Sequence, residues 1–426
     1  MFCRLIQQRA GHGQSVARIG EKAAYDLEPQ YMELVPTTPR HGLHSWHIGH
    51  IDHTPLPLTF LLGDYTDIAD TLWLTILTGA FDRKVRAYYL SFDEPSYRSC
   101  LMVVRDCVRR HGRFFMRVVS DGGSDFQSAY WETLLALLGA DKRERLKGKP
   151  RAGCVCERIF LTTQTQFVTN LLGSREIVEK HFRAISPEVM PETHAVWVID
   201  SFDVAFESYL ETIYHKAHHS GLDMSPDEAD ALSLRSHGLR AFKRFTYDDQ
   251  FIAQTCPEVH KGDALVQPTG IKIKSRWFDA PVLHQPGILK TRVPARYDPW
   301  NLGLAHVFVN NRWHQVHSKH YATFSKLTER AIRFATEALR LIASKRGQKA
   351  VVNAENLARF MMTNEGQEAL ARQLRNDAQV AAHRDKIQGP AQPTSPVRAA
   401  IPSGSNVVSF PVPTKSAAPG LRRAAR

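Results

Sequence analysis

The stretch SWHIGHIDHTPLPL, residues Ser45–Leu58, decides how the first part of the chain folds. Pro55 and Pro57 disfavour a helix, because proline lacks the backbone N–H that a helical hydrogen bond needs. An extended strand fits better, and its side chains alternate between two faces. On one face, Asp52 lies among residues that lead into an apolar core, where a carboxylate is rare unless it is paired or binds a metal. Asp52 is therefore the first candidate functional residue.

Histidine recurs at every third position around this stretch, at His41, His44, His47, His50 and His53. In a continuous strand this spacing sends the rings to both faces, so they cannot converge on one ion. We expect none of His41, His44, His47 and His53 to bind a catalytic metal. His50 shares a face with Asp52, and we expect it to pack or donate a hydrogen bond near the site.

Outward from this stretch, the hydrophobic periodicity predicts three adjacent strands, a helix, a strand and two helices. A turn at 82–84 joins the second and third strands, and glycines follow each helix. Three antiparallel strands followed by alternating elements predict a mixed α/β sheet with helices on its faces. In order, the predicted elements are strands within 50–63, 71–81 and 85–92, a helix at 96–112, a strand at 114–121, helices at 125–139 and 154–173, and a basic loop at 142–153 before the last helix.

The second half of the chain changes character twice. A helical section is followed by short strands with turn residues between them, typical of a small barrel, and VNNRW at 309–313 suits a tight hairpin. Two helices follow, at about 318–345 and 354–386, and then a tail rich in Pro, Ser and Ala. We divide the chain into an N-terminal remnant or linker (1–43), a catalytic core (44–175), a helical extension (176–245), a barrel (246–317), C-terminal helices (318–387) and a disordered basic tail (388–426).

Composition narrows the class of partner. The 426 residues carry a net charge of +12, which favours nucleic acid, although an ordinary basic protein is the plainer alternative. Six irregularly spaced cysteines do not form a disulfide framework and fit a reducing compartment. We see no signal peptide and no run long enough to span a bilayer, so we expect a cytoplasmic, nucleoid-associated protein with no membrane partner.

Two further carboxylates stand out beside Asp52. Asp121 ends the fourth predicted strand before two glycines, and Glu157 opens a helix after the basic loop. Taken singly, such residues are usually a turn residue and a helix-dipole partner. Together, they suit Mg²⁺ or Mn²⁺, and a pair of such ions stabilises both oxygens of a phosphodiester displacement. The nearby basic residues are expected to contact phosphates: Lys142, Arg143, Arg145, Lys147, Lys149, Arg151 and Arg158.

The motifs HIDHTPL, VVSDGGSDF and RAGCVCERIFLTTQTQFV, in that order, resemble the three acidic motifs of DDE transposases and retroviral integrases. ARYDPWNLGLAHVFVNNRW resembles the barrel signature of bacterial transposases of the phage Mu type, and SFDEPSYRSCLMVVRDCVRRHG resembles their core. The resemblance spans roughly residues 40–345.

This resemblance implies a ribonuclease H-like core with a mixed five-stranded sheet, then a helical segment, a small all-β barrel and C-terminal helices. Asp52, Asp121 and Glu157 fall on the catalytic, metal-binding acids of the family. The family implies two divalent ions, cleavage and strand transfer of double-stranded DNA at element ends and target, a homo-oligomer on DNA, and an AAA-type ATPase as target-selection partner.

The chain also departs from the family. The family's usual DNA-binding domains precede the core, but only about fifty residues precede Asp52 here, so a truncated copy or a mis-assigned start is expected. This leaves two alternatives: a catalytically silent DNA-binding protein, and a nuclease of the same fold acting on RNA–DNA hybrids. Among other acids, we interpret Asp82 as structural and Asp125 as a helix cap rather than a substitute ligand.

Overall fold

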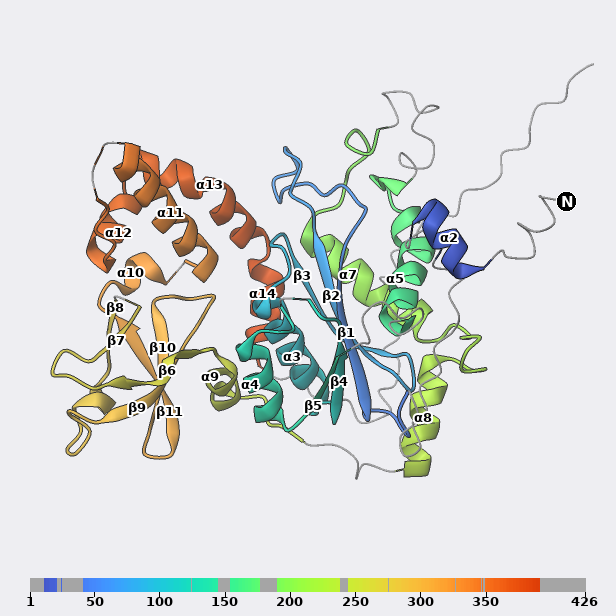
Figure 1. Cartoon of the computed structure of the whole chain (residues 1–426), viewed down its shortest axis with the longest axis horizontal. Coiled ribbons are helices and arrows are strands. Elements are labelled where there is room, and N and C mark those ends of the chain that lie inside the picture. The colour runs from blue at the N-terminus through green and yellow to red at the C-terminus, as the bar shows by residue number, and fades with distance from the viewer. Residues whose placement is uncertain are drawn as a thin grey trace, which may run out of the picture. The chain divides into compact units, whose positions relative to one another are not determined.

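The computed structural model describes most of the chain (Figure 1). It describes residues 11–20, 24, 41–123, 125–144, 154–176, 190–237, 244–274, 276–325, 327–345, 347 and 349–390. Residues 1–10, most of the predicted basic loop and the tail from 391 lie outside these ranges. One short helix, α2 (His12–Ile19), precedes the core.

The core is a five-stranded sheet in the order β3-β2-β1-β4-β5. β2 is antiparallel to β1 and β3, whereas β4 is parallel to both β1 and β5. These are the strand order and directions of a ribonuclease H-like core, so the predicted fold class is confirmed. The strands are β1 (Ile48–Pro55), β2 (Trp73–Gly79), β3 (Val85–Ser91), β4 (Arg117–Ser120) and β5 (Asp141–Glu144).

Two predictions about these strands were wrong. The basic loop begins as β5, because the backbone of Asp141–Glu144 pairs with β4 along its whole length. Short, charged strands are common at sheet edges, where they prevent further pairing, so the composition concealed this one. The second wrong prediction is that one continuous strand carries all five histidines, since β1 begins at Ile48. His41, His44 and His47 precede it in turns, and Trp46 interrupts the extended chain with a φ of 70°.

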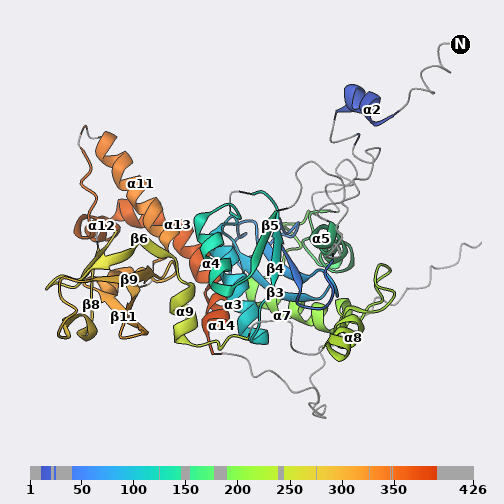
Figure 2. The ribbon, with the colours of Figure 1, turned by 60° about the horizontal axis from the view of Figure 1, so that its bottom comes forward.

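Helices cover both faces of the sheet. α3 packs against β3 and β2, and α5 packs against β1 and β2. Figures 1 and 2 both draw α3 and α4 to one side of the strands and α5 to the other. Capping fixes these helices as the sequence predicts, since Gly112 and Gly139 end α3 and α4 in the left-handed conformation that suits glycine. The helices are α3 (Tyr97–His111), α4 (Ala129–Leu138) and α5 (Cys154–Gln166).

The helical section after the core is more broken than its pattern predicts. A 3-10 helix (Val168–Asn170) follows α5, and a π-helical turn (Leu210–Tyr214) extends α7. Among the described residues of this section, the helices are α7 (Ile199–Tyr209) and α8 (Pro226–His237), and α9 (Asp249–Thr255) lies at the start of the range predicted for the barrel. α7 contributes Phe202 and Phe206 to the core, both essentially buried.

A second sheet of six strands forms the predicted barrel, nearly closed because β6 and β7 approach each other. Its hairpin between β10 and β11 turns at Asn310 and Asn311, both with positive φ, as the VNNRW motif predicts. The strands are β6 (Glu258–Leu265), β7 (Ile271–Ile273), β8 (Arg276–Asp279), β9 (Arg292–Tyr297), β10 (Leu304–Val309) and β11 (Arg312–Ser318). A 3-10 helix (Pro281–His284) follows β8.

Five helices replace the two predicted at the C-terminal end of the described chain. Thr328 and Thr363 each accept a backbone hydrogen bond at a helix start, so these side chains divide the predicted helices. Val380 and Ile387 join the hydrophobic cluster of the core. The helices are α10 (Tyr321–Phe324), α11 (Glu329–Lys345), α12 (Ala354–Met361), α13 (Asn364–Gln379) and α14 (Ala381–Gln388). Within the described ranges, no helix is both long enough and apolar enough to cross a membrane.

Candidate active site

Asp52 lies on β1, and Asp121 directly follows the neighbouring parallel strand β4. His50 of β1 is paired with Val119 of β4, and each aspartate follows two residues later on its own chain. Adjacent strands are about 4.8 Å apart, so the two backbones run side by side at this level. Both aspartates are half-buried. The sheet therefore places the backbone segments that carry these two predicted site residues next to each other.

Backbone N–H groups orient both carboxylates. Gly123 N donates to Asp121 Oδ1 at 2.9 Å, and His53 N donates to Asp52 Oδ1 at 2.9 Å. The Gly123 bond is also the geometry of an ordinary turn, so by itself it does not identify a site. Asp121 becomes a site candidate because it follows the strand that pairs with the strand of Asp52.

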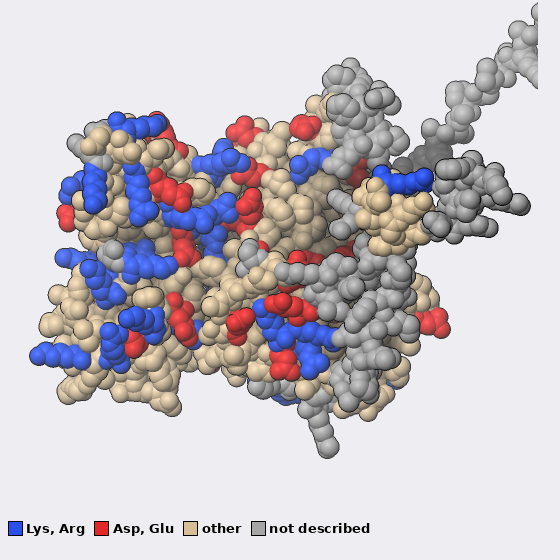
Figure 3. Space-filling model, in the orientation of Figure 1, with Lys and Arg blue, Asp and Glu red and all other residues tan. Residues whose placement is uncertain are grey.

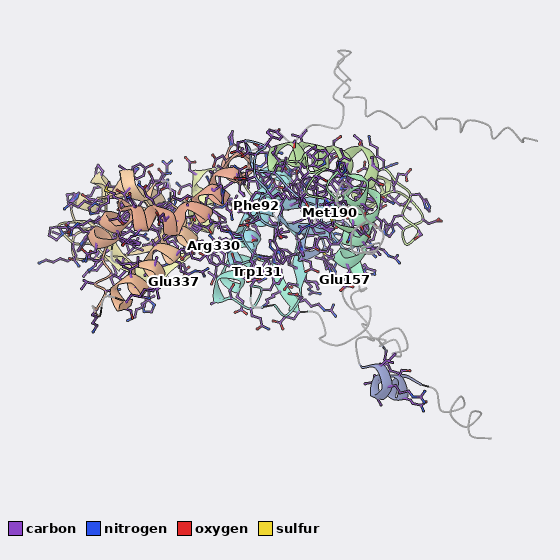
Figure 4. All side chains as sticks on the ribbon, turned by 90° about the horizontal axis from the view of Figure 1, so that it is seen from above. Phe92, Trp131, Glu157, Met190, Arg330 and Glu337 are labelled. Atoms are coloured by element: carbon purple, nitrogen blue, oxygen red, sulfur yellow. The ribbon has the colours of Figure 1, made fainter. Side chains whose placement is uncertain are left out.

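Glu157, the third predicted acid, lies in the first turn of helix α5 and is labelled in Figure 4. Its neighbours Cys156 and Ile159 are buried, whereas Glu157 itself is exposed. One turn later, Phe160 lines a small cavity together with Thr54 of β1. α5 thus packs beside the end of the strand that carries Asp52.

The three acids do not form a ready metal site. Within the described ranges, no group of three His, Cys, Asp or Glu side chains is placed to hold a metal ion. The donor type nevertheless fits Mg²⁺ or Mn²⁺, which prefer carboxylate oxygens. Asp125 adds a second observation, since burial and the charge of Asp121 raise its pKa. Two carboxylates close enough to repel each other would be stabilised by a cation.

Asp125 was wrongly predicted to be a helix cap. Ser128 caps α4 instead, because its hydroxyl accepts from Trp131 N at 3.2 Å. The Ser128 hydroxyl in turn donates to the backbone oxygen of Asp125 at 2.9 Å, which leaves the Asp125 carboxylate outside the cap. The structural interpretation of Asp82 agrees with its position, since it is fully buried and pairs with Arg86.

His53 follows Asp52 on β1 and is a neighbour of the candidate site. Its ring stacks on Phe126 with centroids 4.8 Å apart, and Nδ1 lies 2.8 Å from Thr75 Oγ1. Burial lowers the pKa of His53 to about 4, while the charge of Asp121 opposes that shift. His53 is therefore neutral at pH 7 and packs against Phe126 in the loop after β4. Alternation along β1 gave no signal of this contact, because it depends on the loop after β4.

His50 is also buried, as expected.

The predicted phosphate contacts fall partly on β5 and α5. Lys142 lies on β5 and pairs with Glu132 and Glu144 at 3.3 and 3.2 Å. Arg143 is half-buried on the same strand, and Arg158 is exposed on α5. The other four predicted contacts, Arg145, Lys147, Lys149 and Arg151, lie outside the described residues.

Two curated transposases match part of the chain, and no family model matches it. The transposase for insertion sequence element IS904 of Lactococcus lactis is 26% identical over 182 residues, covering 41% of this chain and 62% of the relative. The transposase for transposon Tn552 of Staphylococcus aureus is 27% identical over 133 residues, covering 30% of this chain and 27% of the relative. The chain thus spans less than two thirds of either relative.

Solved structures of viral integrases show weak likeness. A simian T-cell lymphotropic virus intasome chain is 13% identical with a TM-score of 0.32, covering 74% of this chain and 96% of that one. The HTLV-2 integrase catalytic core domain in complex with magnesium is 12% identical with a TM-score of 0.29, covering 44% and 99%. Scores this low add nothing to the topology described above. What the sequences show is that the chain is similar, over part of its length, to bacterial transposases.

Proposed function

We propose that the chain is a DNA transposase of the phage Mu type, which cleaves and joins DNA strands with the help of divalent ions. The observation that supports this most is the parallel pairing of β1 with β4, since Asp52 and Asp121 each follow the paired residues His50 and Val119 by two positions. The partial similarity to two transposases supports the same substrate class.

In this proposal Asp52, Asp121 and Glu157 hold the metal. Mg²⁺ or Mn²⁺, when bound there, supplies charge that stabilises the attacking and leaving oxygens of a phosphodiester. The backbone N–H groups of His53 and Gly123 keep two of the carboxylates in a fixed orientation. Glu157, on the exposed first turn of α5, would supply the third carboxylate.

Neutral His53 has a positioning role in this site. Its stacking on Phe126 holds the loop after β4, which carries Asp125, against the strand that carries Asp52. A ring that stays uncharged at pH 7 adds no positive charge that would compete with a cation beside Asp121.

DNA would approach the acids across basic side chains on β5 and α5. Lys142, Arg143 and Arg158, with Arg145, Lys147, Lys149 and Arg151, are proposed to contact phosphates. A homo-oligomer on DNA and an AAA-type ATPase partner remain predictions that rest on the family resemblance.

Nicking of supercoiled plasmid with Mg²⁺ or Mn²⁺ tests the proposal. We expect Asp52→Asn, Asp121→Asn and Glu157→Gln each to reduce nicking to background, whereas Glu132→Gln, a control at an exposed acid on α4, keeps wild-type activity. Activity that persists in a chelator would contradict the metal dependence. A folded chain that binds DNA but never nicks it would favour the silent DNA-binding alternative, and cleavage confined to RNA–DNA hybrids would favour the nuclease.

A further inference from the structure

A cavity of about 530 Å³ lies away from the acids, where the start of α3, the barrel strands β7 and β8, and helices α11 and α12 meet. Leu302, Ile332 and Leu357 give it an apolar wall. Two of its lining residues, Arg330 and Glu337, are labelled in Figure 4. Two acidic side chains line the cavity, Glu329 and Glu337. Six cationic side chains also line it: Arg98, Lys274, Arg276, Arg330, Arg333 and Arg340.

Carboxylates balance only part of this positive charge. Glu329 accepts from Lys274 Nζ at 2.6 Å and from Tyr297 at 3.1 Å. Asp93 lies 3.2 Å from the guanidinium of Arg98 and 3.5 Å from that of Arg330. Among the residues that the structure describes, no carboxylate lies within ion-pair distance of the other three cations, Arg276, Arg333 and Arg340.

Arg276 is the informative member of this group. It is only 4% exposed, and its Nε has no hydrogen-bond partner among the described residues. The ring of Phe324 lies 5.5 Å from its guanidinium carbon, which offsets part of the desolvation. Burial lowers the pKa of Arg276 to about 10, so it stays charged at pH 7. The charge of Glu329, which lines the same cavity, offsets only part of this burial, so a bound anion would further stabilise the Arg276 guanidinium.

We propose that this cavity binds an unpaired nucleotide, with its phosphate against Arg276 and Arg333 and its base against the apolar wall. Guanidinium groups pair with phosphate through two parallel hydrogen bonds. A volume of this order suits a single small ligand rather than a DNA duplex. Figure 3 shows lysines and arginines gathered over the C-terminal helices and along their boundary with the core, which would guide a strand toward it. Assignment to a DNA strand, rather than to a free nucleotide, rests on the proposed function.

Fluorescence anisotropy in the presence of EDTA tests this without catalysis. The probes are a labelled thymidine ten-mer, its duplex, and unlabelled dTMP as competitor. We expect Arg276→Gln to weaken binding of the single-stranded ten-mer about tenfold, or about 1.4 kcal/mol. Arg333→Gln, at an exposed position, should weaken it about threefold. The matched control is Arg312→Gln, an exposed arginine of the same barrel outside the cavity, which should leave affinity within twofold.

The affinities for the ten-mer and for dTMP distinguish a DNA strand from a free nucleotide as the ligand. Ten-mer binding that is much tighter than dTMP binding, and that depends on Arg276, assigns the cavity to a DNA strand. Equal, Arg276-dependent affinities assign it to a free nucleotide. The proposal is overturned if the Arg276 and Arg333 variants, checked for wild-type folding by circular dichroism, bind like the Arg312 variant. Failure of the transposase proposal would show separately, as absent nicking by a chain that still binds the ten-mer.

Discussion

Replacing Asp82 by Asn should destabilise the core, although the same kind of change at Asp52 should not. Asp82 is fully buried and pairs with Arg86, whose side chain is 3% exposed. Its other oxygen accepts from Lys84 N at 3.1 Å, in the turn between β2 and β3. Arg86 thus forms a buried ionic cluster with Asp82 and Asp230.

The loss of stability in Asp82→Asn depends on how the buried charge of Arg86 is still balanced. Removing one partner of a buried ion pair costs about 3–5 kcal/mol, because the other charge stays buried. Arg86 keeps Asp230, which it contacts at 2.8 and 3.0 Å, so the loss should be near the lower limit, about 3 kcal/mol. Asp141→Asn is the matched control. Its side chain is 74% exposed and 3.4 Å from Arg117, and such surface pairs contribute less than about 1 kcal/mol.

Urea denaturation followed by tryptophan fluorescence measures both variants. Trp46 is buried and its ring lies 4.5 Å from the guanidinium carbon of Arg86, so its emission reports on this cluster. An Asp82→Asn variant as stable as Asp141→Asn would refute the reasoning. It would also reopen Asp82 as a candidate for the active site, because a buried acid that does not contribute to stability needs another explanation.

Three further predictions concern protons, salt and metal. Burial and the charge of Arg86 lower the pKa of His111 to about 3 in the folded protein, below the 6.5 of the unfolded chain, so its contribution to stability is present above pH 6.5 and lost below it. Between pH 8 and pH 5 that loss is about 2 kcal/mol, and His111→Gln should remove it from the measured pH profile. Binding of duplex DNA should weaken steeply with salt, with a slope of about −0.9 per phosphate contact; a flat dependence would contradict a phosphate footprint. Changing His41, His44 and His47 to Gln should leave the Mg²⁺ concentration for half-maximal nicking unchanged, whereas a tenfold shift would place these rings in the metal site.

Local signals predicted the parts of the fold that local chemistry determines. Helix α3 ends at Gly112 because the left-handed C-cap needs glycine there, and the β10–β11 hairpin turns at two asparagines that tolerate positive φ. The alternating pattern around Asp52 likewise placed this residue on a strand that leads into the core. In each case the residues that decide the structure lie within a few positions of one another.

Contacts between residues far apart in the sequence determine the features that the sequence did not predict. β5 has no hydrophobic alternation and exists because β4 offers it a ladder of backbone partners. The contact of His53 with the loop after β4 depends on the distant residue Phe126, so no spacing rule in β1 could reveal it. The divisions at Thr328 and Thr363 were readable as capping residues, but the continuous helical periodicity around them concealed the breaks.

The most direct test of the account is binding of Mn²⁺ to the intact protein, with duplex DNA present, measured by isothermal titration calorimetry. If Asp52 and Asp121 share an ion across β1 and β4, then Asp52→Asn and Asp121→Asn should each weaken Mn²⁺ binding at least about tenfold, or about 1.4 kcal/mol. Glu132→Gln should bind as the wild type does. Mn²⁺ binding that is equally strong in all four proteins would contradict a metal site built on these two strands.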